Sequence, residues 1–132
     1  MSQPIMNGTL NRLQPYAIAL LRVVAGLLYL EHGTQKLFNF PIEGPGNLAA
    51  LTLASGLLEL IGGALIVLGF FTRPVAFLLS GHMAFAYFMA HAPRSFFPVA
   101  NGGDAAILFS FVFLALVTTG PGAFSLDGRQ GR

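Results

Sequence analysis

Residues 48–70 read LAALTLASGLLELIGGALIVLGF, and this stretch decides the class of fold because it contains a single charge, Glu59. A helix that spans a membrane needs about 20 mainly apolar residues, so the stretch predicts a transmembrane helix. The residues three and four positions from Glu59 are all small: Ser55, Gly56, Gly62 and Gly63. Small residues let another helix approach closely. We therefore expect the carboxylate of Glu59 to face protein rather than lipid.

Three further apolar stretches predict spans at about 16–38, 74–92 and 104–119, in addition to 48–70. The whole chain of 132 residues is 55% hydrophobic and 9% charged, with a mean hydropathy of +0.70. Soluble domains carry about 25% charged residues. Four spans leave room for connectors and short tails only. We predict an all-α membrane protein that forms one domain, 1–132, with four transmembrane helices packed as a bundle.

The basic residues near the span ends predict the orientation in the membrane. Four of them would lie on the side of the N-terminus and two on the other side, namely Arg12, Arg73, Arg129 and Arg132 against Lys36 and Arg94. The positive-inside rule then favours both termini on the cytoplasmic side, N-in and C-in. The first fifteen residues are mostly polar or turn-forming. We expect them to precede the first span, which is retained in the mature protein.

The composition also excludes several kinds of chemistry. The chain contains no cysteine, which excludes disulfides, thiolate nucleophiles and zinc or iron–sulfur sites held by thiolates. Its basic residues occur singly rather than in runs, which argues against nucleic acid as a partner. The three histidines show no metal-ligand spacing. We predict no metal site and no covalently bound cofactor.

Charged residues at membrane depth usually face the interior of a bundle and have partners. Counting 1.5 Å per residue from the ends of the predicted spans places Arg22, His82 and Glu59 at about 9, 12 and 13 Å from the inner edge of the membrane. We therefore predict a buried polar cluster of these three residues. Two interpretations stay open. Arg22 and Glu59 form a structural ion pair beside a hydrogen-bonded core histidine, or the cluster handles a proton and hydrogen-bonds a ligand.

A second polar layer is predicted near the outer surface. It consists of Glu31, His32, Lys36, His91, Arg94 and Asp104, together with Gln35 and Asn101. As a vestibule, this layer would admit a ligand to the buried cluster. Its long charged side chains are also typical of residues that extend to the membrane interface. Asp104 follows Asn101-Gly102-Gly103, and we expect it to cap the N-terminus of the fourth span.

Three segments carry a resemblance to a known family. They are the run from Leu21-Arg22 to GTQKL at 33–37, the ELIGG at 59–63 that leads to LGFFTR at 68–73, and the closing GPGAFSLD at 120–127. In this order they resemble the DoxX family of small bacterial membrane proteins with four helices. The resemblance implies a multi-pass protein of the bacterial inner membrane.

The resemblance also implies a function. The family takes its name from a subunit of an archaeal thiosulfate:quinone oxidoreductase, and some relatives are similar to membrane partners of thiol-handling and superoxide-removing enzymes. A membrane subunit or anchor of a redox complex is therefore expected, with a soluble redox enzyme as partner and a quinone as ligand. Without cysteine, thiol chemistry would have to come from the partner. A small permease or channel built as a homo-oligomer, and an assembly protein without activity, stay open as alternatives. No catalytic residue is assigned.

Overall fold

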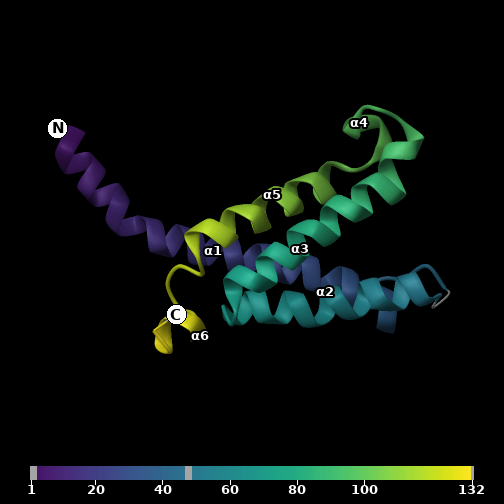
Figure 1. The fold of residues 1–132 in the computed structure, drawn as a ribbon, viewed down its shortest axis with the longest axis horizontal. Helices are drawn as coiled ribbons and strands as arrows, with labels where there is room; N and C mark the ends of the chain where they lie inside the picture. The colour runs from purple at the N-terminus through teal and green to yellow at the C-terminus, as the bar shows by residue number, and fades with distance from the viewer. Residues whose placement is uncertain (1–2, 47–48, 132) are drawn as a thin grey trace.

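The structure is a computed structural model that describes residues 3–46 and 49–131. The regular elements in this part of the chain are all helical, which confirms the predicted all-α class (Figure 1). Six are α-helices: α1 (Gln3–Phe38), α2 (Ala50–Leu68), α3 (Thr72–Ala86), α4 (Pro98–Asn101), α5 (Asp104–Thr119) and α6 (Leu126–Arg129). A π-helical turn, η1 (Tyr87–His91), and a 3-10 turn, η2 (Ala92–Arg94), continue α3.

Three helical stretches are long and apolar enough to cross a membrane, namely Pro4–Phe38, Ala50–Leu68 and Thr72–Arg94. Helix α5 is a fourth, shorter apolar helix whose bounds are those predicted, 104–119. Its 16 residues correspond to about 24 Å, less than the ~30 Å hydrocarbon core. Which end of the molecule faces the cytoplasm stays a prediction.

Two helices differ in extent or type from the predicted spans. The first helix begins at Gln3 rather than near residue 16, because a helix that has been nucleated gains one hydrogen bond per added residue even where the side chains are polar. The purple N-terminal part of α1 therefore extends away from the other helices (Figure 1). The third span does not stay α-helical to residue 92. It changes to the π-helical turn η1 at Tyr87, and such turns are frequent at functional sites.

The four long helices form two antiparallel pairs, α1 with α2 and α3 with α5. Figure 1 shows the pairs close together where α2 passes into α3, a region that we call the vertex, and diverging toward the opposite end. Contacts between the pairs are correspondingly sparse beside those within each pair. Tyr29, Ile66, Leu79 and Phe113 pack together as a buried core between the pairs.

Glycines set the register of α1 against α2. A Cβ atom added at Gly33 would lie 2.7 Å from the backbone nitrogen of Leu60 and 2.8 Å from the carbonyl oxygen of Gly56. A Cβ atom at Gly63 would lie 2.8 Å from the Cβ of Leu30. Real Cβ atoms do not approach so closely, so these two helices pack with their backbones almost in contact, as small residues allow in membrane proteins.

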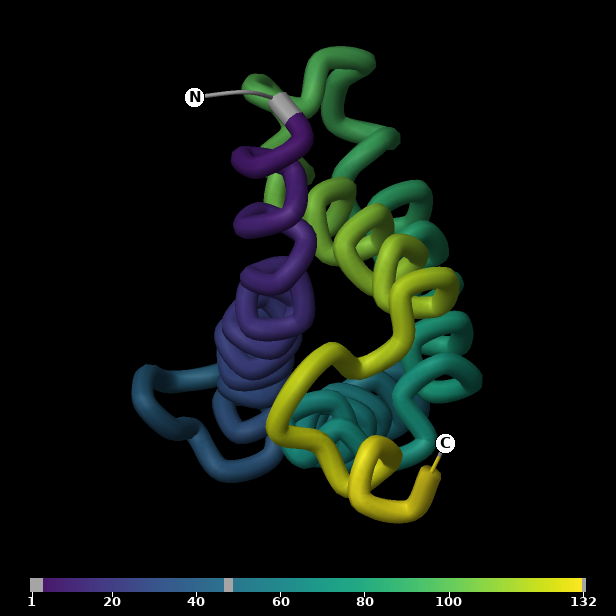
Figure 2. Tube along the Cα trace, turned by 90° about the vertical axis from the view of Figure 1, so that its left-hand side faces the viewer, coloured from purple at the N-terminus to yellow at the C-terminus, as the bar shows by residue number. Residues whose placement is uncertain are grey.

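The C-terminal tail, residues 120–129, ties the vertex together, and we call it the C-terminal clamp. In Figure 2 this yellow segment runs from the end of α5 toward α1 and α2. Arg22 of α1 is 1% exposed. Its guanidinium donates hydrogen bonds to three backbone carbonyl oxygens of the tail, those of Pro121, Ala123 (3.0 Å) and Phe124 (2.8 Å).

Asp127 makes the second connection of the clamp. Its carboxylate accepts hydrogen bonds of 2.8 Å from the backbone nitrogens of Phe71 and Thr72, where α3 begins. These nitrogens belong to the N-terminal turn, where helix donors lack partners within the helix and a negative charge is favourable. The Asp127 nitrogen also donates to the carbonyl oxygen of Gly69. The clamp therefore joins α1, the α2–α3 turn and the end of the chain.

Candidate functional site

A cleft of about 560 Å³ lies between the two helix pairs, and we call it the inter-pair cleft. Its walls come from α1, α2, α3, η1 and α5, and they are mostly apolar, with Leu58, Met83, Phe85, Met89 and Phe109 among the lining residues. Pockets for small molecules measure about 300–1,000 Å³ and combine apolar walls with a few polar groups. The inter-pair cleft has these properties.

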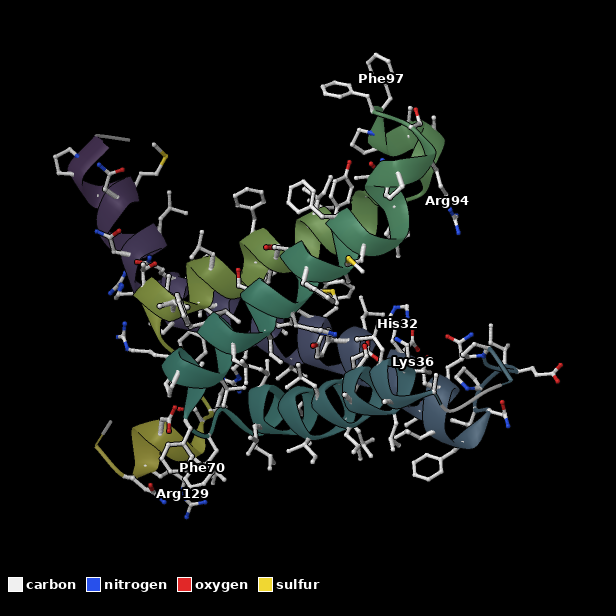
Figure 3. The ribbon with its side chains drawn as sticks, turned by 45° about the vertical axis from the view of Figure 1, so that its right-hand side comes forward. His32, Lys36, Phe70, Arg94, Phe97 and Arg129 are labelled. Carbon is white, nitrogen blue, oxygen red and sulfur yellow. The ribbon has the colours of Figure 1, made fainter. Side chains whose placement is uncertain are left out.

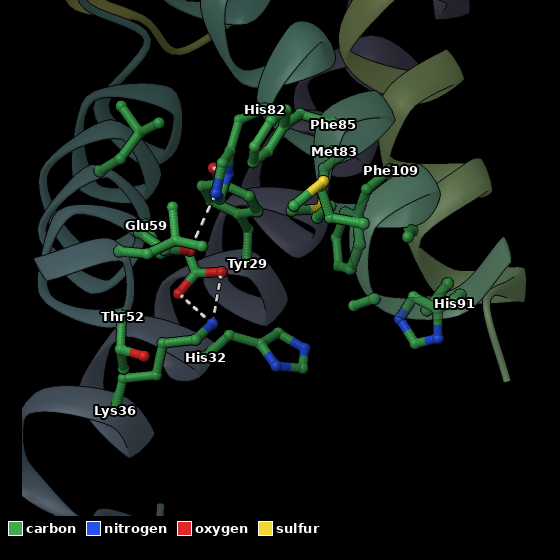
Figure 4. Close-up of a pocket in the computed structure, with 18 of the residues that line it drawn as sticks. Tyr29, His32, Lys36, Thr52, Glu59, His82, Met83, Phe85, His91 and Phe109 are labelled. Atoms are coloured by element: carbon green, nitrogen blue, oxygen red, sulfur yellow. Dashed lines mark hydrogen bonds and ion pairs between the residues drawn. The ribbon is translucent and has the colours of Figure 1, made fainter. Parts of the chain in front are cut away.

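An ion pair between α1 and α2 lines the cleft. The Lys36 ammonium lies 2.7 and 2.8 Å from the two carboxylate oxygens of Glu59 (Figure 4). Glu59 is 3% exposed, whereas the Lys36 side chain is 26% exposed. The close approach of the two helices at Gly33 puts these side chains within reach of each other. Burying the carboxylate is tolerated because its charge is matched and both of its oxygens are hydrogen-bonded.

A chain of hydrogen bonds through His82 crosses the base of the cleft. The Tyr29 hydroxyl of α1 lies 2.6 Å from His82 Nδ1, and the Ser55 hydroxyl of α2 lies 2.9 Å from His82 Nε2. His82 itself belongs to α3. Tyr29 is fully buried, with its ring against the edges of Phe109 and Phe113. Three helices thus contribute to one polar chain.

Two more histidines, His32 and His91, line the cleft. Figure 3 shows His32 and Lys36 between the pairs, and Arg94 at the far tip of the α3–α5 pair. His91 lies 3.0 Å from the carbonyl oxygen of Asn101. Asn101 is buried and its side-chain nitrogen donates to the hydroxyl of Tyr87. These bonds attach α4 to the π-helical turn and position His91.

The structure does not bring Arg22 to Glu59 and His82. The depth estimate placed the first residue of each predicted span at a membrane surface, but the glycine contacts place Gly33 beside Glu59. Arg22 is eleven residues away from Gly33 on α1, about 16 Å along the helix. It therefore binds the C-terminal clamp, and the interpretation in which Arg22 and Glu59 form an ion pair was wrong. His82 is a fully hydrogen-bonded histidine that also lines the cleft.

The structure also separates the members of the predicted outer layer. Three of its members line the cleft: His32, Lys36 and His91. The other five do not line it: Glu31, Arg94 and Asp104 are exposed, Gln35 is half-buried and Asn101 is buried. Asp104 was expected to cap the fourth span, but Gly103 occupies that position without a side-chain cap, and Asp104 is the first helical residue. Its charge still lies in the first turn, where the helix dipole favours it.

Sequence reasoning did not include Tyr29 and Ser55 in the site. Both carried a signal. Tyr29 shares one helical face with Gly33 and Lys36, and Ser55 lies one turn before Glu59. In the described part of the chain, no three His, Asp or Glu side chains gather as a possible metal site.

Comparison with known proteins identifies the family. The DoxX family model matches residues 17–92, a range that includes Tyr29, Lys36, Ser55, Glu59 and His82. The chain belongs to the DoxX family. This DoxX protein is 42% identical over 129 residues to an uncharacterized protein of Haemophilus influenzae, covering 92% of this chain and 96% of that one.

Two further relatives are named as inner membrane proteins of Escherichia coli. YphA is 30% identical over 129 residues, covering 88% of this chain and 91% of its own. YqjF is 26% identical over 131 residues, covering 89% and 95%. No solved structure matches. With its apolar helices, this DoxX protein is an integral protein of the inner membrane.

The Lys36–Glu59 contact predicts coupled effects on stability. Lys36→Met leaves a buried carboxylate without its counter-ion, whereas Lys36→Met combined with Glu59→Leu removes both charges, so the double variant should recover part of the loss. We expect a coupling free energy of about 1–2 kcal/mol in a double-mutant cycle, measured by SDS-induced unfolding in detergent. The control cycle pairs Glu59→Leu with Arg94→Met on the exposed tip and should be additive. Additive effects of Lys36 and Glu59 would contradict the contact.

Proposed function

We propose that this DoxX protein is a membrane subunit of a redox complex and that its inter-pair cleft binds the head group of a lipophilic quinone. The observation that supports this is the combination of apolar walls with two polar groups at one place, the Lys36–Glu59 ion pair and the His82 hydrogen-bond chain. A quinone needs the same combination, because its ring and tail are apolar and its two carbonyl oxygens accept hydrogen bonds.

The cleft has donors of the required kind. An ammonium group has three N–H donors, and Lys36 uses two of them on Glu59. The third is left for a ligand oxygen. Met83, Phe85 and Phe109 provide flat or flexible apolar contacts for a ring. Because the helix pairs diverge and contact each other sparsely, a ligand dissolved in the membrane has access from the side.

The remaining roles follow from the residues of the chain. A quinone, when bound, supplies chemistry with two electrons and two protons. The Lys36 ammonium and His82 hold protons beside the cleft, and Glu59 holds the ammonium in place. With no cysteine in the chain, thiol-derived electrons would come from a soluble partner enzyme. Because this chain would bind the quinone and a partner would supply the electrons, we favour a membrane subunit over a complete enzyme.

Filling the cleft should abolish quinone binding. Ala105 is an exposed residue of α5 that lines the cleft, whereas Ala115 is an exposed residue of the same helix that does not. We expect Ala105→Trp to weaken equilibrium binding of decylubiquinone to the purified protein at least about 10-fold, since the indole occupies the site. Ala115→Trp should bind as the wild type does. Equal binding by both variants, or no binding by the wild type, would contradict the proposal.

The redox part of the proposal needs a separate experiment. The complex is purified from native membranes in mild detergent, and co-purifying proteins are identified by mass spectrometry. Recovery of a soluble oxidoreductase that reduces decylubiquinone only in the presence of this chain supports the proposal. Recovery of the chain with copies of itself alone contradicts the role as a subunit.

A further inference from the structure

The direction of the hydrogen bonds through His82 follows from the burial of Tyr29. The Tyr29 hydroxyl has one hydrogen-bond partner among the described residues, His82 Nδ1 at 2.6 Å, and its surroundings are the apolar rings of Phe109 and Phe113. A buried hydroxyl that fails to donate its proton costs free energy. The favourable arrangement therefore has Tyr29 donate to Nδ1.

This donation determines the tautomer of the imidazole. A neutral histidine has one donor nitrogen and one acceptor nitrogen. When Nδ1 accepts from Tyr29, the proton of His82 lies on Nε2, which then donates to the Ser55 oxygen 2.9 Å away. The hydroxyl proton of Ser55 is not used in this bond. It remains to be donated to another acceptor.

Ser55 lines the inter-pair cleft and is half-buried. Glu59 follows it by one helical turn on the same face of α2. Without a ligand, the Glu59 carboxylate is therefore within reach as an acceptor for the Ser55 proton. Both carboxylate oxygens already accept from Lys36, so an oxygen of a ligand can replace Glu59 as the acceptor without breaking the ion pair.

We propose that Tyr29 orients His82 so that Ser55 is the hydrogen-bond donor at the base of the cleft, and that the cleft selects ligands with an acceptor oxygen at this point. The inference rests on the proposed function, in which that oxygen is a quinone carbonyl. Ser55 contacts the ligand, whereas Tyr29 is a positioning residue that acts through His82. A chain of donors directed at one point discriminates against a ligand that lacks the acceptor, because the donor is then left unpaired.

The tautomer can be measured without any ligand. In protein labelled with 15N-histidine, NMR distinguishes a protonated Nε2 from a protonated Nδ1, and the His82 signals are assigned by comparison with His32→Gln and His91→Gln. We expect His82 to be neutral with the proton on Nε2. In Tyr29→Phe this preference should be lost, since Nδ1 no longer has a donor. A wild-type His82 with the proton on Nδ1, or on both nitrogens, would overturn the proposal.

Ligand binding gives the second readout. We expect Ser55→Ala and Tyr29→Phe each to weaken decylubiquinone binding about 5-fold, the effect of one hydrogen bond. The double variant should bind no more weakly than Ser55→Ala, because both changes remove the same donor. Matched controls are Ser110→Ala and Tyr16→Phe, which lie outside the cleft and should bind as the wild type does. Additive losses in the double variant would overturn the coupling.

The two readouts also separate this inference from the proposed function. If decylubiquinone does not bind while His82 carries its proton on Nε2 and loses this preference in Tyr29→Phe, quinone binding is wrong and the assignment of Ser55 as donor is supported. If decylubiquinone binds while Tyr29→Phe changes neither the tautomer nor the affinity, quinone binding is supported and the role of Tyr29 is overturned.

Discussion

Replacement of Arg22 by leucine is expected to lower the free energy of unfolding by about 3–5 kcal/mol, enough to prevent recovery of folded protein. The guanidinium is buried and holds three backbone carbonyl oxygens of the C-terminal clamp. Leucine fills part of the volume but donates nothing, so the three oxygens that face the buried guanidinium would lose their donor. Size-exclusion chromatography in detergent and SDS-induced unfolding measure the loss.

Two controls distinguish the effect of the hydrogen bonds from the effect of the charge and from the effect of replacing any arginine of α1. Arg22→Lys keeps the charge and up to three donors but not the planar fork, so we expect an intermediate stability. Arg12→Leu removes an exposed arginine of the same helix and should leave unfolding unchanged. An Arg22→Leu variant as stable as Arg12→Leu would show that the clamp does not hold the vertex together.

Introduction of valine at Gly33 is expected to be the second most damaging change, with a loss of about 3 kcal/mol. Even the Cβ atom would lie 2.7 Å from the backbone of Leu60, which cannot yield as a flexible side chain would. The helices α1 and α2 would have to separate, and the Lys36–Glu59 ion pair would lengthen with them.

Gly81 provides the matched control for this substitution. It lies inside α3, and nothing is found within 4 Å of the position that its Cβ would take. Gly81→Val should therefore be close to neutral, because it introduces no clash. The comparison uses the same SDS unfolding experiment on both variants. Similar losses at Gly33 and Gly81 would mean that helix propensity, rather than the close approach of α1 and α2, decides the outcome.

The apolar runs sufficed to predict the helices, since the length and hydrophobicity of a span are local properties. The stripe of small residues around Glu59 also correctly predicted that this carboxylate is buried against protein. The partners of the charged side chains could not be predicted in this way, because they lie on other helices. The Lys36–Glu59 contact depends on how far α1 is shifted along α2. The glycines set this shift through close backbone contacts, and the lengths of the spans do not reveal it.

The C-terminal clamp and the residues of the cleft show the same limit of prediction from sequence. The closing GPGAFSLD supported the family resemblance, but its physical role became evident only when its carbonyl oxygens were found around Arg22. Tyr29 and Ser55 come from different helices and meet only through His82. Residues that contact each other through a third side chain leave no pattern in a single sequence.

The divergence of the two helix pairs from one vertex has a mechanical consequence. Helices of this length act as levers, so a rotation of about 10° at the vertex would displace ends about 25 Å away by about 4 Å. The far ends would then move while the clamped end stays still. The stiffness of this short joint, which Arg22 and Asp127 hold together, therefore limits how far the cleft can widen and so how large a molecule it accommodates.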